Sequence, residues 1–122
     1  MAHLRWVPLV VTVVLSVGYV YLGVQPRTPD LLRRVPDVAA HAGAYAVLGC
    51  SATLVGRVLA LARPAIWGAA YATAHGAALE GLQEISPRRR AQWRDLLADA
   101  VGAVLGALVA RRLRLFTPRE TA

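Results

Sequence analysis

Polar residues of the types needed for acid–base chemistry recur at helical spacing in a chain that is otherwise largely apolar. Asp37, His41 and Tyr45 are spaced i, i+4 and i+8, so they share one face of a helix. Two later segments carry pairs at i, i+3 and at i, i+4: Glu80 with Gln83, and Asp95 with Asp99. A histidine beside carboxylates suits proton transfer, and a nearby arginine suits phosphate binding. We expect these groups to form one polar site.

Ordinary helix structure explains some of these residues better than others. Asp37 and Asp95 stand where an N-cap carboxylate belongs. Glu80 and Asp99 lie inside apolar stretches, where an unpaired carboxylate costs about 2.5–3.5 kcal/mol in a membrane. We therefore assign the catalytic role to His41, Glu80 and Asp99. The expected substrate-binding residues are Asp37, Tyr45, Gln83, Arg89 and Asp95.

Apolar helices must position these residues. The chain has 122 residues, of which 57% are hydrophobic, and long apolar tracts alternate with short basic loops. A helix of about 20 residues crosses the hydrocarbon core of a membrane. The sequence therefore predicts one all-α domain over residues 1–122, a four-helix transmembrane bundle with short loops. Its helices are expected at about residues 6–24, 38–62, 65–84 and 95–110.

Four helices that alternate in direction would bring the polar residues to one membrane surface. The start of the second helix, the end of the third and the start of the fourth then lie at the same depth. His75 is about 140° round its helix from Glu80, so we interpret it as a helix-contact residue outside the site. Gly102 and Gly106 form a face of small residues on the last helix, which we expect to pack within the chain.

The positive charge of the chain lies mostly near the ends of the apolar tracts. The formal net charge is +7, and every basic residue apart from histidine is an arginine. At these positions membrane lipids with anionic headgroups are simpler partners than nucleic acid. The two membrane surfaces receive equal numbers of arginines, so this count does not choose an orientation. The acids lie mostly on the side of the polar site, which favours cytoplasmic termini in a multi-pass plasma-membrane protein.

The order and spacing of these residues resemble the VanZ-like family of small bacterial membrane proteins. The resemblance covers about residues 30–112. It rests on Asp37-x3-His41-x3-Tyr45-x2-Leu48-Gly49, Glu80-x2-Gln83, Pro87-x-Arg89, Asp95-x3-Asp99 and Gly102-x3-Gly106. The family is named for a component associated with low-level resistance to the glycopeptide teicoplanin. The resemblance implies a membrane protein of the cell envelope and does not carry resistance over to this chain.

Three positions depart from the pattern that is common in the family. Val38 stands where lysine is common, and Ala42 stands where an aromatic residue follows the histidine. Asp99 stands where asparagine is usual, which adds a carboxylate to the site and removes an amide donor.

Three functions of different classes fit these residues. In the first, the site binds or acts on the polar head of a lipid-linked or glycopeptide-related envelope component, with acid–base work at His41, Glu80 or Asp99. In the second, the chain is a non-catalytic scaffold whose polar residues specify helix packing and which works through a membrane protein partner. In the third, the same three residues bind Mg²⁺, Mn²⁺ or Zn²⁺. Because these ligands come from three helices without a tight motif, we expect no metal or cofactor, and enzymatic activity stays open.

Overall fold

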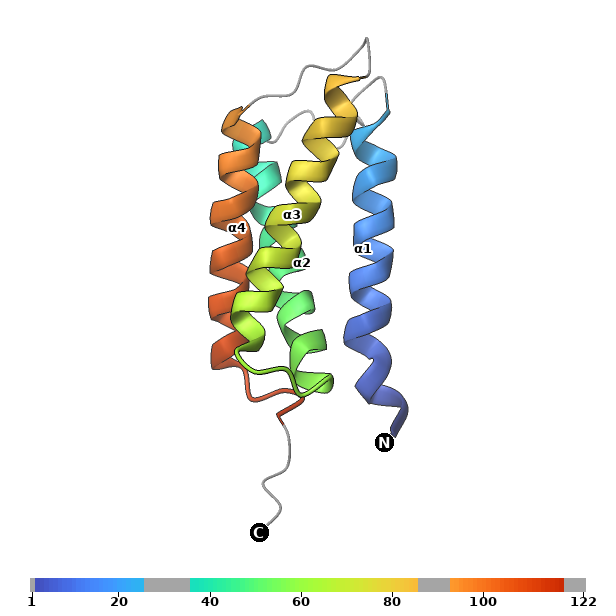
Figure 1. The fold of residues 1–122 in the computed structure, drawn as a ribbon, viewed down its shortest axis with the longest axis vertical. Coiled ribbons are helices and arrows are strands. Elements are labelled where there is room, and N and C mark those ends of the chain that lie inside the picture. Colours follow the sequence, from blue (N-terminus) through green and yellow to red (C-terminus); the bar gives the residue numbers. More distant parts are fainter. Residues whose placement is uncertain (1, 26–35, 86–92, 118–122) are drawn as a thin grey trace.

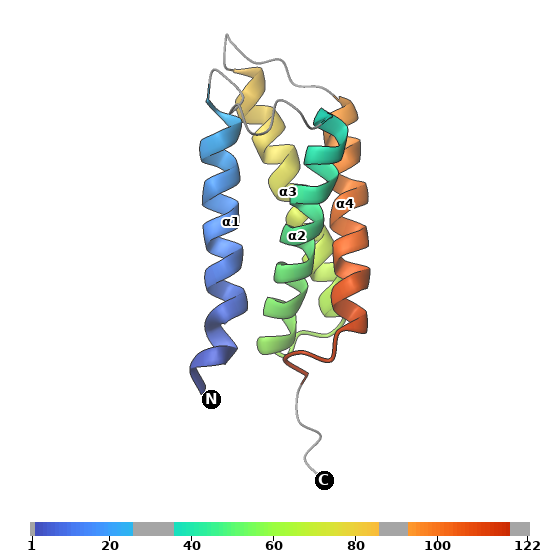
Figure 2. The same cartoon turned by 180° about the vertical axis from the view of Figure 1, so that it is seen from behind.

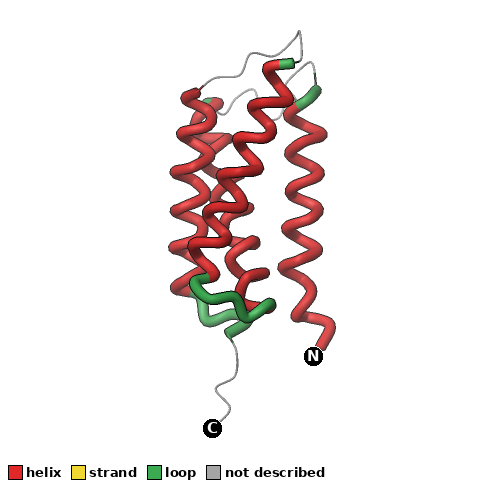
Figure 3. The backbone as a smooth tube through the Cα atoms, viewed as in Figure 1, coloured by secondary structure: helices red, strands yellow, loops and turns green. Residues whose placement is uncertain are grey.

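The computed structural model describes residues 2–25, 36–85 and 93–117. In these residues all regular structure is helical, which confirms the all-α prediction (Figures 1 and 3). The elements follow in the order η1 (Ala2–Trp6), α1 (Val7–Gly23), α2 (Asp37–Val58), α3 (Pro64–Glu84) and α4 (Trp93–Arg112).

The second helix ends earlier than the sequence predicts, at Val58 rather than near residue 62. A Schellman motif closes it, a turn that satisfies the last carbonyl groups of a helix. Ala60 adopts a left-handed conformation with φ 54°. Its N–H donates to Arg57 O, and the N–H of Leu61 donates to Gly56 O, both at 2.9 Å. The apolar residues that follow Val58 therefore form a turn, although their composition suits a helix.

The first turns of α2 and α4 also differ from expectation. Asp37 is the first helical residue of α2 and Pro36 occupies the N-cap position, so capping does not explain Asp37. α4 begins at Trp93 and ends at Arg112, so it is longer at both ends than the predicted 95–110. Asp95 lies within its first turn. Both carboxylates are near the positive end of a helix dipole, which stabilises them.

α2 is the central helix of the bundle. It packs most extensively against α4, less against α3 and least against α1, which also touches α3. Figures 1 and 2 show α2, α3 and α4 as a close group, with α1 (blue) standing beside it. The helices alternate in direction, so the end of α3 lies at the same end of the bundle as the starts of α2 and α4 (Figure 1). The three segments that carry the predicted site are therefore neighbours.

Glycines let α2 and α4 approach closely. Gly102 faces the backbone of Ala42, and Gly106 faces the backbone of Ala46. A Cβ atom at either glycine would lie less than 3.0 Å from a carbonyl oxygen of α2, closer than real Cβ atoms come to other atoms. The small-residue face of α4 thus packs within the chain, against α2.

The buried core is small. Tyr45 and Leu48 of α2, Ala72 of α3 and Ala103 of α4 form one cluster within it, and most of the other buried apolar residues are alanines. Most of the large apolar side chains instead face outward, because glycine and alanine occupy many of the positions between the helices.

The outer surface of the bundle is strongly apolar. Large exposed apolar side chains on α1 and α4 include Val10, Val13, Val14, Val17, Val101, Val104, Leu105, Leu108 and Val109. Two helical stretches among the described residues, Ala2–Gly23 and Asp37–Val58, are long and apolar enough to cross a membrane. Length and composition thus single out two candidate spans, where the sequence led us to expect four.

Candidate functional site

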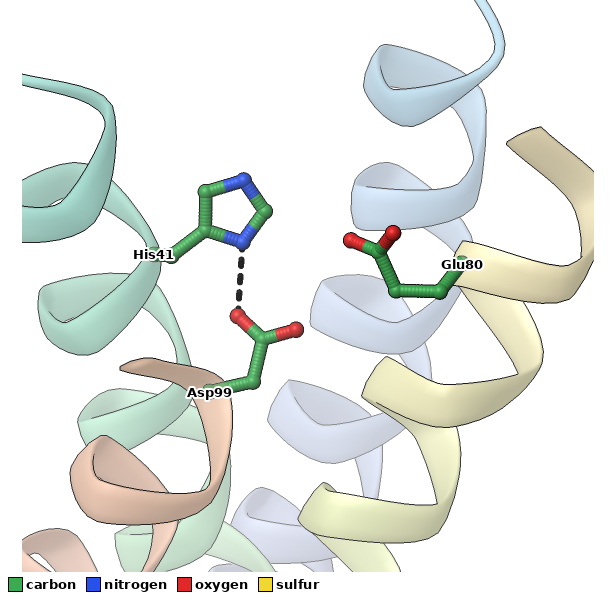
Figure 4. Close-up of side chains that lie close together, drawn as sticks. All are labelled: His41, Glu80 and Asp99. Carbon is green, nitrogen blue, oxygen red and sulfur yellow. Dashed lines mark hydrogen bonds and ion pairs between the residues drawn. The ribbon is translucent and has the colours of Figure 1, made fainter. Parts of the chain in front are cut away.

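His41 and Asp99 form the centre of the polar site (Figure 4). Nδ1 of His41 lies 2.6 Å from Oδ1 of Asp99. An ionised carboxylate only accepts hydrogen bonds, so Nδ1 carries the proton of this bond. Asp99 is buried, with 1% of its side chain exposed, whereas 23% of the His41 side chain is exposed. The carboxylate therefore holds the ring from the interior, and the ring is the more accessible member of the pair.

Two further carboxylates lie near the same imidazole. Oδ2 of Asp95 is 3.6 Å from Nε2 of His41. Glu80 of α3 is 8% exposed. The potential ligand atoms of His41, Glu80 and Asp99 all lie within 4.8 Å of one another. The three residues that the sequence assigns to catalysis are thus together, and Asp95 lies beside them.

Small residues on neighbouring helices make room for this cluster. A Cβ at Gly76 of α3 would lie 2.7 Å from Oδ2 of Asp99, so glycine leaves space for the carboxylate between α3 and α4. Gly102 allows α4 to approach α2 at Ala42, the residue after His41. The i, i+4 spacing of Asp95 and Asp99 then places both carboxylates on the face of α4 that meets His41.

The site is rich in negative charge. Three carboxylates surround one imidazole, and two of them, Glu80 and Asp99, are buried. Oδ2 of Asp99 has no hydrogen-bond partner among the described residues. Burial of ionised carboxylates is costly unless hydrogen bonds or cations compensate for it. The arrangement therefore suits proton transfer through His41 or the binding of a cationic group.

A second polar chain runs from Tyr45 through His75 to α1. The Tyr45 hydroxyl lies 2.9 Å from Nδ1 of His75, and Nε2 of His75 lies 2.9 Å from the backbone oxygen of Ser16. A carbonyl oxygen only accepts, so Nε2 carries a proton, and in the neutral ring Nδ1 accepts the Tyr45 proton. Tyr45, a predicted substrate-binding residue, is therefore hydrogen-bonded to His75, which we interpreted from the sequence as a helix contact.

The remaining predicted residues lie apart from His41 or outside the described chain. Nε2 of the buried Gln83 donates to the backbone oxygen of Gly23 at 3.0 Å, which ties α3 to the end of α1. Asp37 is exposed in the first turn of α2. Arg89, the predicted phosphate ligand, lies outside the described residues. The structure thus divides the predicted set into a His–carboxylate cluster and residues that contact other helices or solvent.

The opposite end of the bundle is basic. Nη1 of Arg57 donates to the backbone oxygens of Leu113 and Leu115, just beyond the end of α4. Arg57, Arg63 and Arg111 are among the residues that line a cavity of about 320 Å³ there. The carboxylate cluster and these three arginines therefore lie at opposite ends of the described bundle.

The fold and the site define a small all-helical protein with a His–carboxylate cluster held between three helices. Comparisons with family models, with curated proteins and with solved structures find no match for the chain. Its function must therefore be inferred from the chemistry of its own residues.

Proposed function

We propose that the chain is a multi-pass bacterial membrane protein of the VanZ-like family that binds or acts on a lipid-linked or glycopeptide-related component of the cell envelope. The observation that carries this proposal is the His41–Asp99 pair, with Glu80 beside it, near one end of a bundle whose outer surface is apolar. The ends of membrane helices lie near lipid headgroups. A site at this position meets the polar part of a lipid while its apolar chain stays in the hydrocarbon.

His41 has the geometry of a general acid or base. Asp99 fixes the orientation of the ring through Nδ1, and Nε2 lies on the side of Asp95. A carboxylate that orients a histidine while the other ring nitrogen transfers a proton is a recurring catalytic arrangement. Glu80 would supply a second proton-transfer group, since its carboxylate faces the same region (Figure 4).

A non-catalytic scaffold is the second candidate, and hydrogen bonds between the helices favour it. The Thr12 hydroxyl donates to the Ser51 hydroxyl at 3.0 Å, and the Tyr19 hydroxyl donates to the backbone oxygen of Ala44 at 2.7 Å. These bonds join α1 to α2. Hydrogen bonds of this kind specify helix packing in membranes. In this function the chain works through membrane protein partners and catalyses no reaction.

We expect the full chain to be embedded in the plasma membrane with both termini in the cytoplasm. The apolar outer surface and the two candidate spans motivate this expectation. Membranes washed with alkaline carbonate should retain the chain. A fluorescent protein fused after Ala122 should fluoresce, and alkaline phosphatase fused at the same point should be inactive. Release by carbonate would contradict membrane insertion, and an active phosphatase fusion would reverse the orientation.

We expect His41 and Glu80 to be needed for binding or turnover of a phosphate-bearing lipid. The wild-type chain in lipid nanodiscs should retain a polyprenyl diphosphate, measured by native mass spectrometry, or release phosphate from it. His41→Gln and Glu80→Gln should lower any turnover by about 100-fold or more, the usual contribution of a general acid or base.

Glu84→Gln is the matched control for this experiment, because Glu84 is an exposed carboxylate on the same helix as Glu80. Its lipid binding and turnover should equal those of the wild-type chain. If the His41, Glu80 and Glu84 variants all behave as the wild type does, the lipid-site proposal fails and the scaffold is favoured.

A further inference from the structure

Three side chains from three helices offer metal-binding atoms to one region. His41 of α2, Glu80 of α3 and Asp99 of α4 each present a ring nitrogen or a carboxylate oxygen, and these atoms lie within 4.8 Å of one another. Ligands bind Zn²⁺ at about 2.0–2.2 Å and therefore stand about 3–4 Å apart. Side-chain rotations that move the ligand atoms by about 1 Å would bring all three onto one ion.

Asp99 gives an independent indication of a cation. Its side chain is 1% exposed, and its Oδ2 has no hydrogen-bond partner among the described residues. Buried polar atoms without partners are rare in folded proteins. Figure 4 shows this oxygen turned to the side on which Glu80 lies. A cation between Asp99 and Glu80 would give Oδ2 a partner and compensate for the buried charge of Asp99.

Asp95 stands where a residue that orients the histidine ligand is needed. If Nδ1 of His41 binds a metal ion, the ring keeps its proton on Nε2, and Nε2 lies 3.6 Å from Oδ2 of Asp95. A histidine that binds a metal almost always donates its other N–H to a carboxylate, a carbonyl group or water. The cluster therefore contains ligands and an orienting group.

We propose that His41, Glu80 and Asp99 bind one divalent cation of the Mn²⁺ or Zn²⁺ type, with Asp95 orienting the imidazole. One imidazole with two carboxylates is a donor set that suits these ions. The proposal deepens the function proposed above and rests on it for the substrate, because the ion would hold the phosphate of the lipid headgroup. Ion binding itself requires no lipid.

Binding of Mn²⁺ alone tests the site. The full chain, purified in detergent and treated with a chelator, is titrated with Mn²⁺ while electron paramagnetic resonance measures the free ion. We expect one ion per chain, and electron spin echo modulation from one imidazole nitrogen. Asp99→Asn and Glu80→Gln should each weaken binding by more than about 100-fold, since loss of an orienting residue alone costs about 10–100-fold. Asp95→Asn should weaken Mn²⁺ binding by the smaller factor of about 10–100-fold.

The controls separate ion binding from folding and from the lipid function. Glu84→Gln should bind Mn²⁺ like the wild-type chain, and excess Mn²⁺ should raise the melting temperature of both. The metal site would be overturned if the wild-type chain bound no ion or showed no imidazole modulation. It would also be overturned if Glu84→Gln weakened Mn²⁺ binding as much as Asp99→Asn and Glu80→Gln do. If the chain binds the ion and no phosphate-bearing lipid, the metal site stands and the lipid function fails.

Discussion

Gly106→Ala should lower the free energy of unfolding by about 1–3 kcal/mol, because it inserts a methyl group where α2 and α4 touch. The new Cβ would lie against the carbonyl oxygen of Ala46, closer than 3.0 Å. That oxygen belongs to helix backbone, which cannot rotate away as a side chain can. α4 must therefore move away from α2, and the packing between the two most extensively joined helices is lost. Thermal or denaturant unfolding in detergent micelles measures the change.

Two other glycines provide the control for this substitution. Among the described residues, a Cβ at Gly43 of α2 or at Gly81 of α3 would meet no atom of a neighbouring helix within 4 Å. Alanine at these positions should leave stability unchanged or raise it by up to about 1 kcal/mol through its higher helix propensity. Equal losses at Gly43, Gly81 and Gly106 would mean that helix contact is not the cause of the effect.

The three-helix cluster could be predicted from the sequence because its geometry depends on few quantities. The i, i+4 spacing of Asp95 and Asp99 fixes their common face, and alternating helix directions fix which helix ends meet. Glu80 and Asp99 also interrupt apolar stretches, which marks them as residues that need partners. These three arguments predict that His41, Glu80 and Asp99 lie together, and none of them requires the rotation of each helix about its own axis to be known.

The partner of Tyr45 could not be found in this way. His75 is separated from Glu80 by about 140° round α3, which excludes it from the Glu80 face. This angle does not tell which helix covers the other faces of α3. In the structure α1 and α2 both reach His75, through Ser16 O and the Tyr45 hydroxyl. Only the rotation of each packed helix about its axis determines such contacts.

Helix ends were predictable where a strong signal marks them and not elsewhere. Pro64 begins α3 one residue before the predicted start, as expected for a proline in a first turn. The end of α2 depends on Ala60 in a left-handed conformation, which alanine rarely adopts. Glycine or asparagine usually occupies this position, so the residue type at Ala60 did not predict the turn that ends α2.

His41→Ala is expected to destabilise the chain by about 2–3 kcal/mol when a chelator is present. Removal of one member of a buried ion pair costs about 3–5 kcal/mol, because the other charge stays buried without a partner. The expected loss is smaller here, since 23% of the His41 side chain is exposed, and water can replace part of its interaction with Asp95. Asp99, with 1% exposed, has no such access to water. Chemical denaturation of the wild-type chain and the variant gives the difference.

Asp99→Asn reveals whether the buried charge is the cause of this loss. Asparagine has almost the same size and accepts a hydrogen bond from Nδ1 of His41, so the single variant should stay close to the wild type in stability. Once the charge is gone, His41→Ala should cost about 1–2 kcal/mol less in the Asp99→Asn background than in the wild-type chain. Additive effects of the two substitutions would contradict a charge pair between them. They would indicate that His41 stabilises the chain through packing alone.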